Sequence, residues 1–152
     1  MRVIRLEMVM AKLSKHGNFD IEVSGNVVCA TLSGSWNSQT AEEFSRQLII
    51  QASPLKGDSW GHLVLLEDWD LGVPEIVPVI EELVTWCIEH GLTRAAQVYS
   101  SSMIKQYHLN EMVVEKFGEF QRNSFEDQYE AESWLAASGF HLDAAYPKPA
   151  QI

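Results

Sequence analysis

Hydrophobic residues along the chain alternate between short continuous runs and longer stretches with helical spacing. Residues 63–66 form a run of four apolar residues, and an acidic turn at residues 67–70 follows them. A run that is apolar on both faces is typical of a central strand in a parallel sheet. The next stretch predicts a helix with one face toward a core, and because Pro78 lacks a donor N–H, we expect an irregular first turn or a regular helix beginning near Pro78. The apolar stripe of this helix consists of Val73, Ile76, Val77, Ile80, Leu83, Val84 and Cys87.

The first part of the chain predicts a hairpin and a helix. Residues 19–23 alternate between apolar and polar side chains, and residues 27–32 form a second strand-like run after a Gly-Asn turn. We expect these two strands to pair antiparallel. A helix then begins near Asn37 or Ser38, which are both good N-cap residues, and ends before Pro54.

The last part of the chain predicts two further strands and two further helices. A strand at 95–99 is followed by Ser100, Ser101 and Ser102, which precede a helix with apolar positions at Ile104, Tyr107, Met112 and Val113. A second strand lies within 117–125, and the last helix runs from Glu126 or Asp127 to Gly139.

This order of elements predicts an α/β fold, with an N-terminal hairpin and a mostly parallel five-stranded sheet with about four helices. Parallel strands joined by helices take right-handed crossovers, so if consecutive strands are also neighbours, the helices stack on one face of the sheet. The other face then needs a cover. Residues 1–15, residues 140–152 and a second copy of the chain are the candidates.

The length of 152 residues favours a single domain. We place its core at about residues 14–139, with an N-terminal extension at residues 1–13 and a tail at residues 140–152 that we expect along the surface. Cys29 and Cys87 each lie within an apolar pattern, which predicts two buried free thiols.

The formal net charge of −10 argues against partners that are themselves polyanions. Nucleic acid and anionic membrane surfaces both attract Lys and Arg clusters and repel acidic surfaces. The sequence contains no apolar stretch long enough to span a membrane and no signal-peptide pattern, so we expect a cytoplasmic protein. No Gly-rich phosphate loop is present, and we expect no cofactor.

The order and spacing of four segments resemble the STAS (sulfate transporter and anti-sigma-factor antagonist) superfamily, in particular its SpoIIAA-like branch. A strand ends in Leu-Ser-Gly-Ser-Trp before a helix, and the last helix contains Ala-Glu-Ser-Trp-Leu, similar to the ending of many branch members. The four segments are residues 27–36, 63–70, 98–107 and 130–135, within a resemblance that covers about residues 14–139.

The resemblance implies a superhelix of strand–helix units and a role as a regulatory docking partner for another protein. Signalling members of the superfamily have an Asp-Ser pair after the central strand, and the serine is phosphorylated. Here the matching residues 67–72 read Glu-Asp-Trp-Asp-Leu-Gly and contain no hydroxyl group. A switch that adds phosphate charge at a helix N-terminus cannot operate without a hydroxyl.

Three loops should meet beyond the carboxyl ends of the strands, where α/β sheets tend to bind ligands. Together they could form a pocket with apolar walls and a few polar anchors. Alternatively, the serines and acids cap helices and the tryptophans cover the edge of the core. The candidate ligand-binding residues are Trp36, Asn37, Asp68, Trp69, Asp70, Ser100, Ser101 and Ser102.

The sequence predicts neither a metal site nor a catalytic site. Glu67, Asp68 and Asp70 match no EF-hand spacing, and the five histidines form no zinc pattern. A Ser101–His108 hydrolase would lack the Gly-x-Ser-x-Gly elbow. We therefore predict a protein that is not an enzyme.

Two functions remain open from the sequence. The first is a non-enzymatic STAS-like module that binds a protein partner or forms a homodimer. The second is a carrier of a small apolar ligand or lipid that uses the Trp36 and Trp69 loops, which would require a cavity of at least about 300 Å³.

Overall fold

The structure is a computed structural model that describes residues 17–70 and 74–143. These residues form a seven-stranded sheet with the order β1-β2-β3-β5-β7-β6, and β4 pairs with the end of β2. The β1–β2 and β6–β7 pairs are antiparallel, and the pairs among β2, β3, β5 and β7 are parallel. The strands are β1 (Asn18–Ser24), β2 (Val27–Ser35), β3 (Trp60–Leu65), β4 (Trp69–Asp70), β5 (Leu92–Val98), β6 (Lys116–Phe117) and β7 (Phe120–Phe125).

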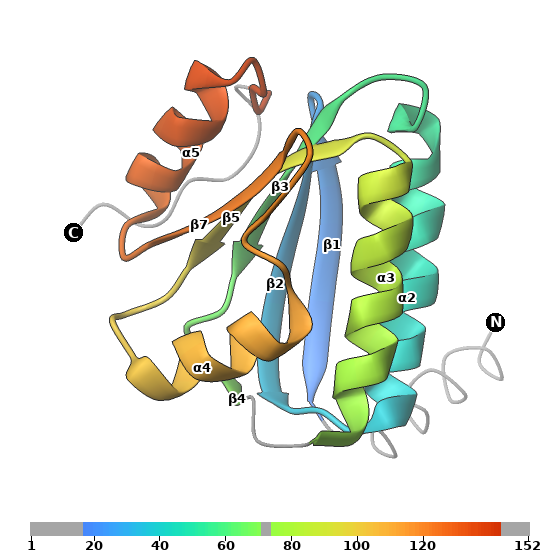
Figure 1. Ribbon diagram of the computed structural model, residues 1–152, viewed down its shortest axis with the longest axis vertical. Coiled ribbons are helices and arrows are strands. Elements are labelled where there is room, and N and C mark those ends of the chain that lie inside the picture. The colour runs from blue at the N-terminus through green and yellow to red at the C-terminus, as the bar shows by residue number, and fades with distance from the viewer. Residues whose placement is uncertain (1–16, 71–73, 144–152) are drawn as a thin grey trace, which may run out of the picture.

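Within the described residues, four α-helices pack against this sheet, on both of its faces (Figure 1). Helices α2 and α3 lie side by side over one face, α4 lies on the same side near the carboxyl ends of the strands, and α5 covers the opposite face. The helices are α2 (Ser38–Ala52), α3 (Val77–Glu89), α4 (Met103–Met112) and α5 (Gln128–Ala137), and 3₁₀ turns at Ser53–Leu55 and Pro74–Ile76 complete the elements.

The predicted α/β fold is confirmed, and the differences from the predicted elements have local causes. The 3₁₀ turn Pro74–Ile76 before α3 is the irregular first turn that Pro78 predicts, because proline at the second helical position needs no donor. The short strands β4 and β6 were not predicted. Each has two residues, and strands this short depend on tertiary pairing more than on a sequence pattern.

The sheet separates two hydrophobic cores. The first lies under α2, α3 and α4, and the second lies under α5. The expectation that every helix covers one face is wrong for α5, because this helix follows the last parallel strand and makes no crossover that would fix its side. The second core consists of Val27, Cys29, Leu63, Ala96, Ala131, Leu135 and Phe140.

The start of the predicted tail belongs to this second core. Phe140 is buried with 5% of its surface exposed, and Leu142 packs against the same cluster. Two backbone groups fix the segment to the β1–β2 turn, since His141 N donates to Asn26 Oδ1 and Asp143 N donates to Ser24 Oγ, each at 2.8 Å. The cover of the second face therefore comes from α5 and from residues 140–142 together.

Candidate functional site

The three candidate loops meet at the carboxyl end of the sheet, as the sequence predicts. The Ser35 hydroxyl donates to Asp70 Oδ2 at 3.0 Å, and the Ser100 hydroxyl donates to Glu67 Oε1 at 2.7 Å. Lys105 Nζ joins α4 to the same turn by donating to the carbonyl oxygens of Leu66 and Glu67 at 2.9 Å and 2.6 Å.

The two tryptophans are core residues. Trp36 is 1% exposed and Trp69 is 3% exposed, and their rings meet edge to face with centroids 5.1 Å apart. The indole N–H of Trp36 donates to the carbonyl oxygens of Asn18 and Ser33. These rings close the end of the first core and do not form the walls of an open surface pocket.

Asn37 and Ser102 act as helix caps. Asn37 Oδ1 accepts from Thr40 N at 2.9 Å at the start of α2, and Ser102 Oγ accepts from Lys105 N at 3.2 Å at the start of α4. Ser101 contributes its backbone N–H, which donates to Glu126 Oε1 at 2.9 Å. The capping interpretation of the sequence thus holds for Asn37 and Ser102.

The acidic turn keeps its carboxylates at the surface. Glu67, Asp68 and Asp70 are all exposed. Hydrogen bonds from Ser100 and the nearby Lys105 ammonium lower the pKa of Glu67, so its carboxylate is ionised at neutral pH. Within residues 17–70 and 74–143, no three His, Cys, Asp or Glu side chains are grouped in a way that could hold a metal ion.

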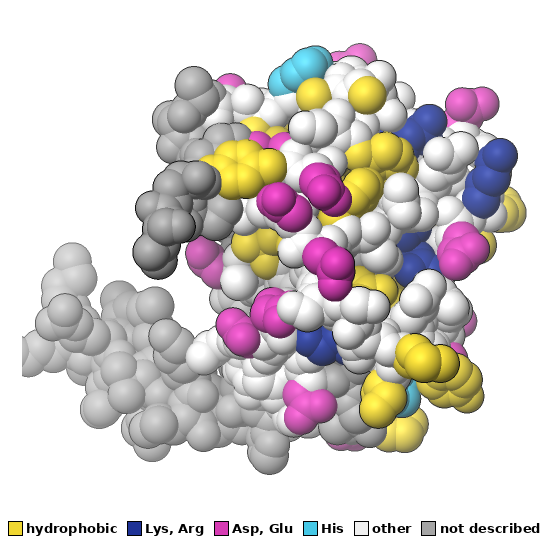
Figure 2. All heavy atoms as spheres, turned by 90° about the vertical axis from the view of Figure 1, so that its left-hand side faces the viewer, with side chains coloured by type: hydrophobic (Ala, Val, Ile, Leu, Met, Phe, Trp, Pro, Cys, Tyr) yellow, Lys and Arg dark blue, Asp and Glu magenta, His cyan; other side chains and the backbone are white. Residues whose placement is uncertain are grey.

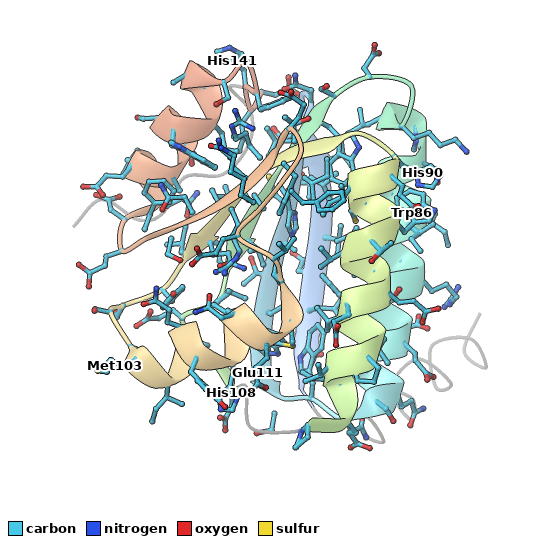
Figure 3. The ribbon with its side chains drawn as sticks, viewed as in Figure 1. Trp86, His90, Met103, His108, Glu111 and His141 are labelled. Atoms are coloured by element: carbon cyan, nitrogen blue, oxygen red, sulfur yellow. The ribbon has the colours of Figure 1, made fainter. Side chains whose placement is uncertain are left out.

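An exposed apolar surface adjoins this acidic turn on α4. Met103 is 90% exposed, Ile104 is 72% exposed and Tyr107 is 64% exposed, and we call these three residues the α4 patch. Figure 2 shows this cluster at the lower right of the molecule, beside a histidine. His108 and Glu111 project from the same helix in Figure 3.

Sequence reasoning missed the α4 patch because it grouped Ile104 and Tyr107 with Met112 as apolar positions of one helix. In the structure, Leu109 and Met112 are the buried residues of α4. A signal was available, since the Ser102 cap fixes the helix start and thereby places residues 103, 104 and 107 on a different face from residues 109 and 112.

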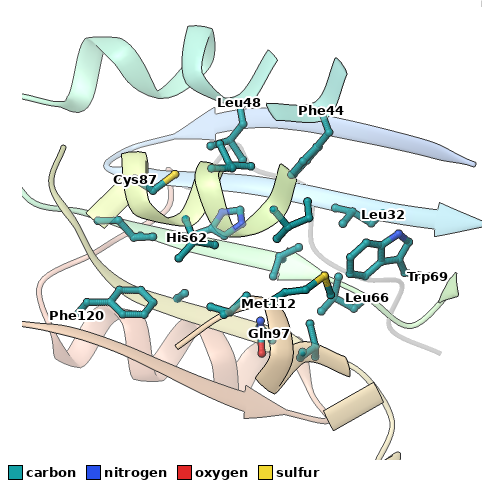
Figure 4. Close-up of a pocket in the computed structure, with 18 residues that line it drawn as sticks. Leu32, Phe44, Leu48, His62, Leu66, Trp69, Cys87, Gln97, Met112 and Phe120 are labelled. Atoms are coloured by element: carbon teal, nitrogen blue, oxygen red, sulfur yellow. The ribbon is translucent and has the colours of Figure 1, made fainter. Parts of the chain in front are cut away.

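The first core contains a cavity of about 80 Å³ between the sheet and α2, α3 and α4 (Figure 4). Its lining is apolar except for His62, Gln97 and the indole N–H of Trp69, and Cys87 contributes its thiol. Burial raises the pKa of the Cys87 thiol to about 12, so this sulfur is not a thiolate nucleophile at neutral pH. Both cysteines are buried and free, as the sequence predicts.

Comparison with known proteins bears on the fold. No protein-family model matches the sequence, and no curated protein matches it. A solved structure does match: an uncharacterised DUF3478-family protein with a SpoIIAA-like fold from Shewanella loihica. The alignment covers 80% of this chain and 94% of that chain, with a TM-score of 0.61 and 17% sequence identity. The fold is SpoIIAA-like.

The SpoIIAA-like fold confirms the resemblance that the sequence predicts. In this structure, the acidic turn at residues 67–70 follows the central strand β3. A sequence identity of 17% extends the likeness to the fold and not to a binding partner or a reaction. None of the helices within the described ranges is long and apolar enough to cross a membrane.

Proposed function

We propose that this protein is a non-enzymatic docking module that binds a protein partner through the α4 patch and the acidic turn beside it. The observation on which the proposal depends is the exposure of Met103, Ile104 and Tyr107 as one contiguous group. Single exposed apolar side chains are normal on protein surfaces, whereas a contiguous group next to polar residues is typical of an interaction site.

The chemistry of the surface defines the partner. Methionine and tyrosine are enriched at protein interfaces, where they supply contact area. The surrounding acids are Glu67, Asp68 and Asp70 on the turn, and Glu111, whose hydrogen bond with Tyr107 raises the pKa of that phenol. A partner segment that presents apolar side chains flanked by Lys or Arg would match this surface, and the net charge of −10 would accelerate its approach.

The acidic turn also determines how this docking would be regulated. Residues 67–70 contain no hydroxyl group that could accept a phosphate. Phosphorylation of this turn therefore could not switch docking on or off. The same charge opposes a contact between two copies through their α4 patches, since like charges would face each other.

The proposal that the protein is not an enzyme has support from the roles of the reactive side chains. Ser102 caps α4, and the Ser100 hydroxyl is bonded to Glu67. The Cys87 thiol is buried and protonated. A catalytic nucleophile needs an adjacent base that activates it. The roles of these three side chains are instead structural.

The test compares Ile104→Glu with Ile50→Glu as a matched control. Ile50 is 54% exposed on α2, away from the α4 patch. Both variants and the original protein serve as baits in cell extract, and any protein lost only with Ile104→Glu is purified and titrated by calorimetry. We expect Ile104→Glu to weaken binding at least about tenfold, as for a central interface residue, and Ile50→Glu to leave it unchanged.

Binding should also weaken as salt is added, because the partner is basic. Equal affinity of the purified partner for all three baits would contradict the proposal. A sedimentation experiment in which the protein forms a dimer, and only Ile104→Glu dissociates it, would also contradict the proposal. The α4 patch would then bind a second copy of the chain. The homodimer expected from the sequence stays a prediction.

A further inference from the structure

The core cavity differs from an ordinary packing defect because two of its polar wall groups have unused hydrogen-bonding capacity. The remaining lining comes from strands, loops and α2, α3 and α4, and it is apolar except for the indole N–H of Trp69, which is buried without a partner within the described residues. Empty cavities in proteins are normally apolar throughout, and buried polar groups are normally satisfied. Two unused groups on the wall of one cavity therefore indicate an occupant.

His62 supplies the acceptor. Its Nδ1 lies 2.7 Å from the carbonyl oxygen of Val28, so Nδ1 donates and Nε2 is left as an acceptor in the neutral ring. Within the described residues, Nε2 of His62 has no hydrogen-bond partner, and it keeps some accessible surface. His62 is half-buried, and its ring lies on the wall of the cavity (Figure 4).

Gln97 supplies the donor. Its Oε1 accepts from Arg122 Nη1 at 3.0 Å, which fixes the orientation of the amide and leaves Nε2 as a donor. Figure 4 shows this nitrogen turned toward the cavity. As with His62, this nitrogen has no hydrogen-bond partner within the described ranges and keeps some accessible surface.

The volume limits the occupant. An engineered protein cavity of about 150 Å³ holds benzene, which has six carbon atoms, so a cavity of about half that volume suits three or four non-hydrogen atoms. A single water molecule would find in this polar pair only the minimum of two partners and would leave the apolar part of the cavity unfilled. A small molecule with a hydroxyl group and a short hydrocarbon part matches both the polar pair and the apolar remainder.

We propose that the core cavity is a binding site for a compact alcohol, whose hydroxyl donates to His62 Nε2 and accepts from Gln97 Nε2. The hydrocarbon part occupies the apolar space beneath α3 and α4. This proposal is independent of the docking function, because it concerns the buried side of α4 and not the α4 patch.

The structure also indicates the route of entry. A surface groove of about 510 Å³ lies between α3 and the segment from α4 to β6. Val84, Met112 and Val113 line both the groove and the cavity, so these side chains separate the cavity from solvent. The methionine side chain is unbranched and flexible, and its rotation would open the cavity to the groove.

The test uses two isomers of equal size. Propan-1-ol has a hydroxyl group, and methoxyethane has the same atoms but cannot donate a hydrogen bond. Each is titrated into the ¹³C-methyl-labelled protein, and the spectra report on Met112 and on the Val and Leu methyls of the cavity. We expect saturable shifts of these methyls with propan-1-ol at about millimolar concentrations, and at least about fivefold weaker binding of methoxyethane.

Variants locate the site. Ala95→Val places two methyl groups in the cavity and should abolish the shifts, whereas Ala137→Val on the exposed side of α5 should leave them unchanged. His62→Phe removes the acceptor and should equalise the two isomers. Shifts that stay linear and spread over surface methyls, equal affinity of the original protein for both isomers, or full binding by Ala95→Val would each overturn the proposal. The isomer comparison needs no variant, so it decides even where a variant fails to fold.

Discussion

Buried polar side chains set the character of the first core at the scale of single residues. Arg122 lies in this region with its guanidinium bonded to Gln97 Oε1 at 3.0 Å and Asn110 Oδ1 at 2.6 Å. Glu115 is a more distant partner at 3.8 Å. Burial lowers the pKa of Arg122, but its charge is retained, since an arginine titrates far above neutral pH. A fixed positive group next to the cavity therefore holds Gln97 in one orientation.

His62 gives a prediction at this scale. Burial lowers the pKa of His62 below its ordinary value of 6.5. Below pH 6.5 the unfolded chain therefore binds a proton that the folded chain does not, and the free energy of unfolding falls as the pH falls. We expect urea denaturation between about pH 7.5 and pH 5 to show this loss for the original protein and a flatter profile for His62→Phe.

The exposed His141 provides the control, since His141→Gln should keep the original profile. Glu67 does not interfere in this range. Its pKa is lowered from about 4.5, so the stability that it contributes is present above that pH and is lost only at lower pH. A His62→Phe profile as steep as that of the original protein would contradict the assigned burial.

The sequence predicts some single residues well and others poorly, for physical reasons. Asn37 and Ser102 are recognisable as caps because capping depends on local backbone geometry. The burial of Trp36 and Trp69 depends on contacts between distant segments, so the sequence favoured a core role for them but left a pocket role open. The orientation of His62 toward a cavity has no sequence signal, because it results from the packing of three helices on the sheet.

At the scale of elements, the three consecutive serines before α4 give a matched set of substitutions. Ser102→Ala removes the side-chain acceptor for Lys105 N and should lower the free energy of unfolding by about 1 kcal/mol, as for other N-caps. Ser101→Ala should change it little, because the interaction of Ser101 in this loop is made by its backbone N–H. Urea denaturation of both variants measures the difference. Equal losses would show that Ser102 does not act as the cap.

Helices and long strands were predictable from their sequences, whereas their sides of the sheet were only partly so. Hydrophobic spacing, caps and Pro54 fix the ends of α2, and handed crossovers fix the side of α2, α3 and α4. For α5, the apolar residues show that one face is buried but not which surface buries it. Tertiary contact decides this, since the backs of β2, β3 and β5 offer Val27, Leu63 and Ala96.

At the scale of the whole molecule, stability depends on two cores that share one sheet. Residues 140–142 complete the smaller core, and Phe140 lies against Gly61, where a Cβ would come within 3.0 Å of the Phe140 side chain. This close approach explains why the central strand β3 has a glycine on that side. The segment after α5 is therefore part of the folded unit.

Phe140→Ala should lower the free energy of unfolding by about 3–5 kcal/mol, the usual range when a buried phenylalanine is truncated. Phe117→Ala is the matched control, since Phe117 is 67% exposed and its loss should cost little. Chemical denaturation with a single unfolding transition provides both values. A Phe140→Ala protein as stable as the Phe117→Ala protein would show that α5 closes the second face alone.

Helix α4 faces two environments at once, with Leu109 and Met112 turned to the core cavity and Met103, Ile104 and Tyr107 turned to solvent. A rigid helix cannot shift on one side without shifting on the other, so a ligand in the cavity that displaces α4 as a whole also changes the presentation of the α4 patch. Thermodynamic reciprocity then requires that the docked protein alter alcohol affinity by the same factor as the alcohol alters docking. The ten-residue helix α4 would thus couple alcohol binding in the cavity to protein docking at the α4 patch.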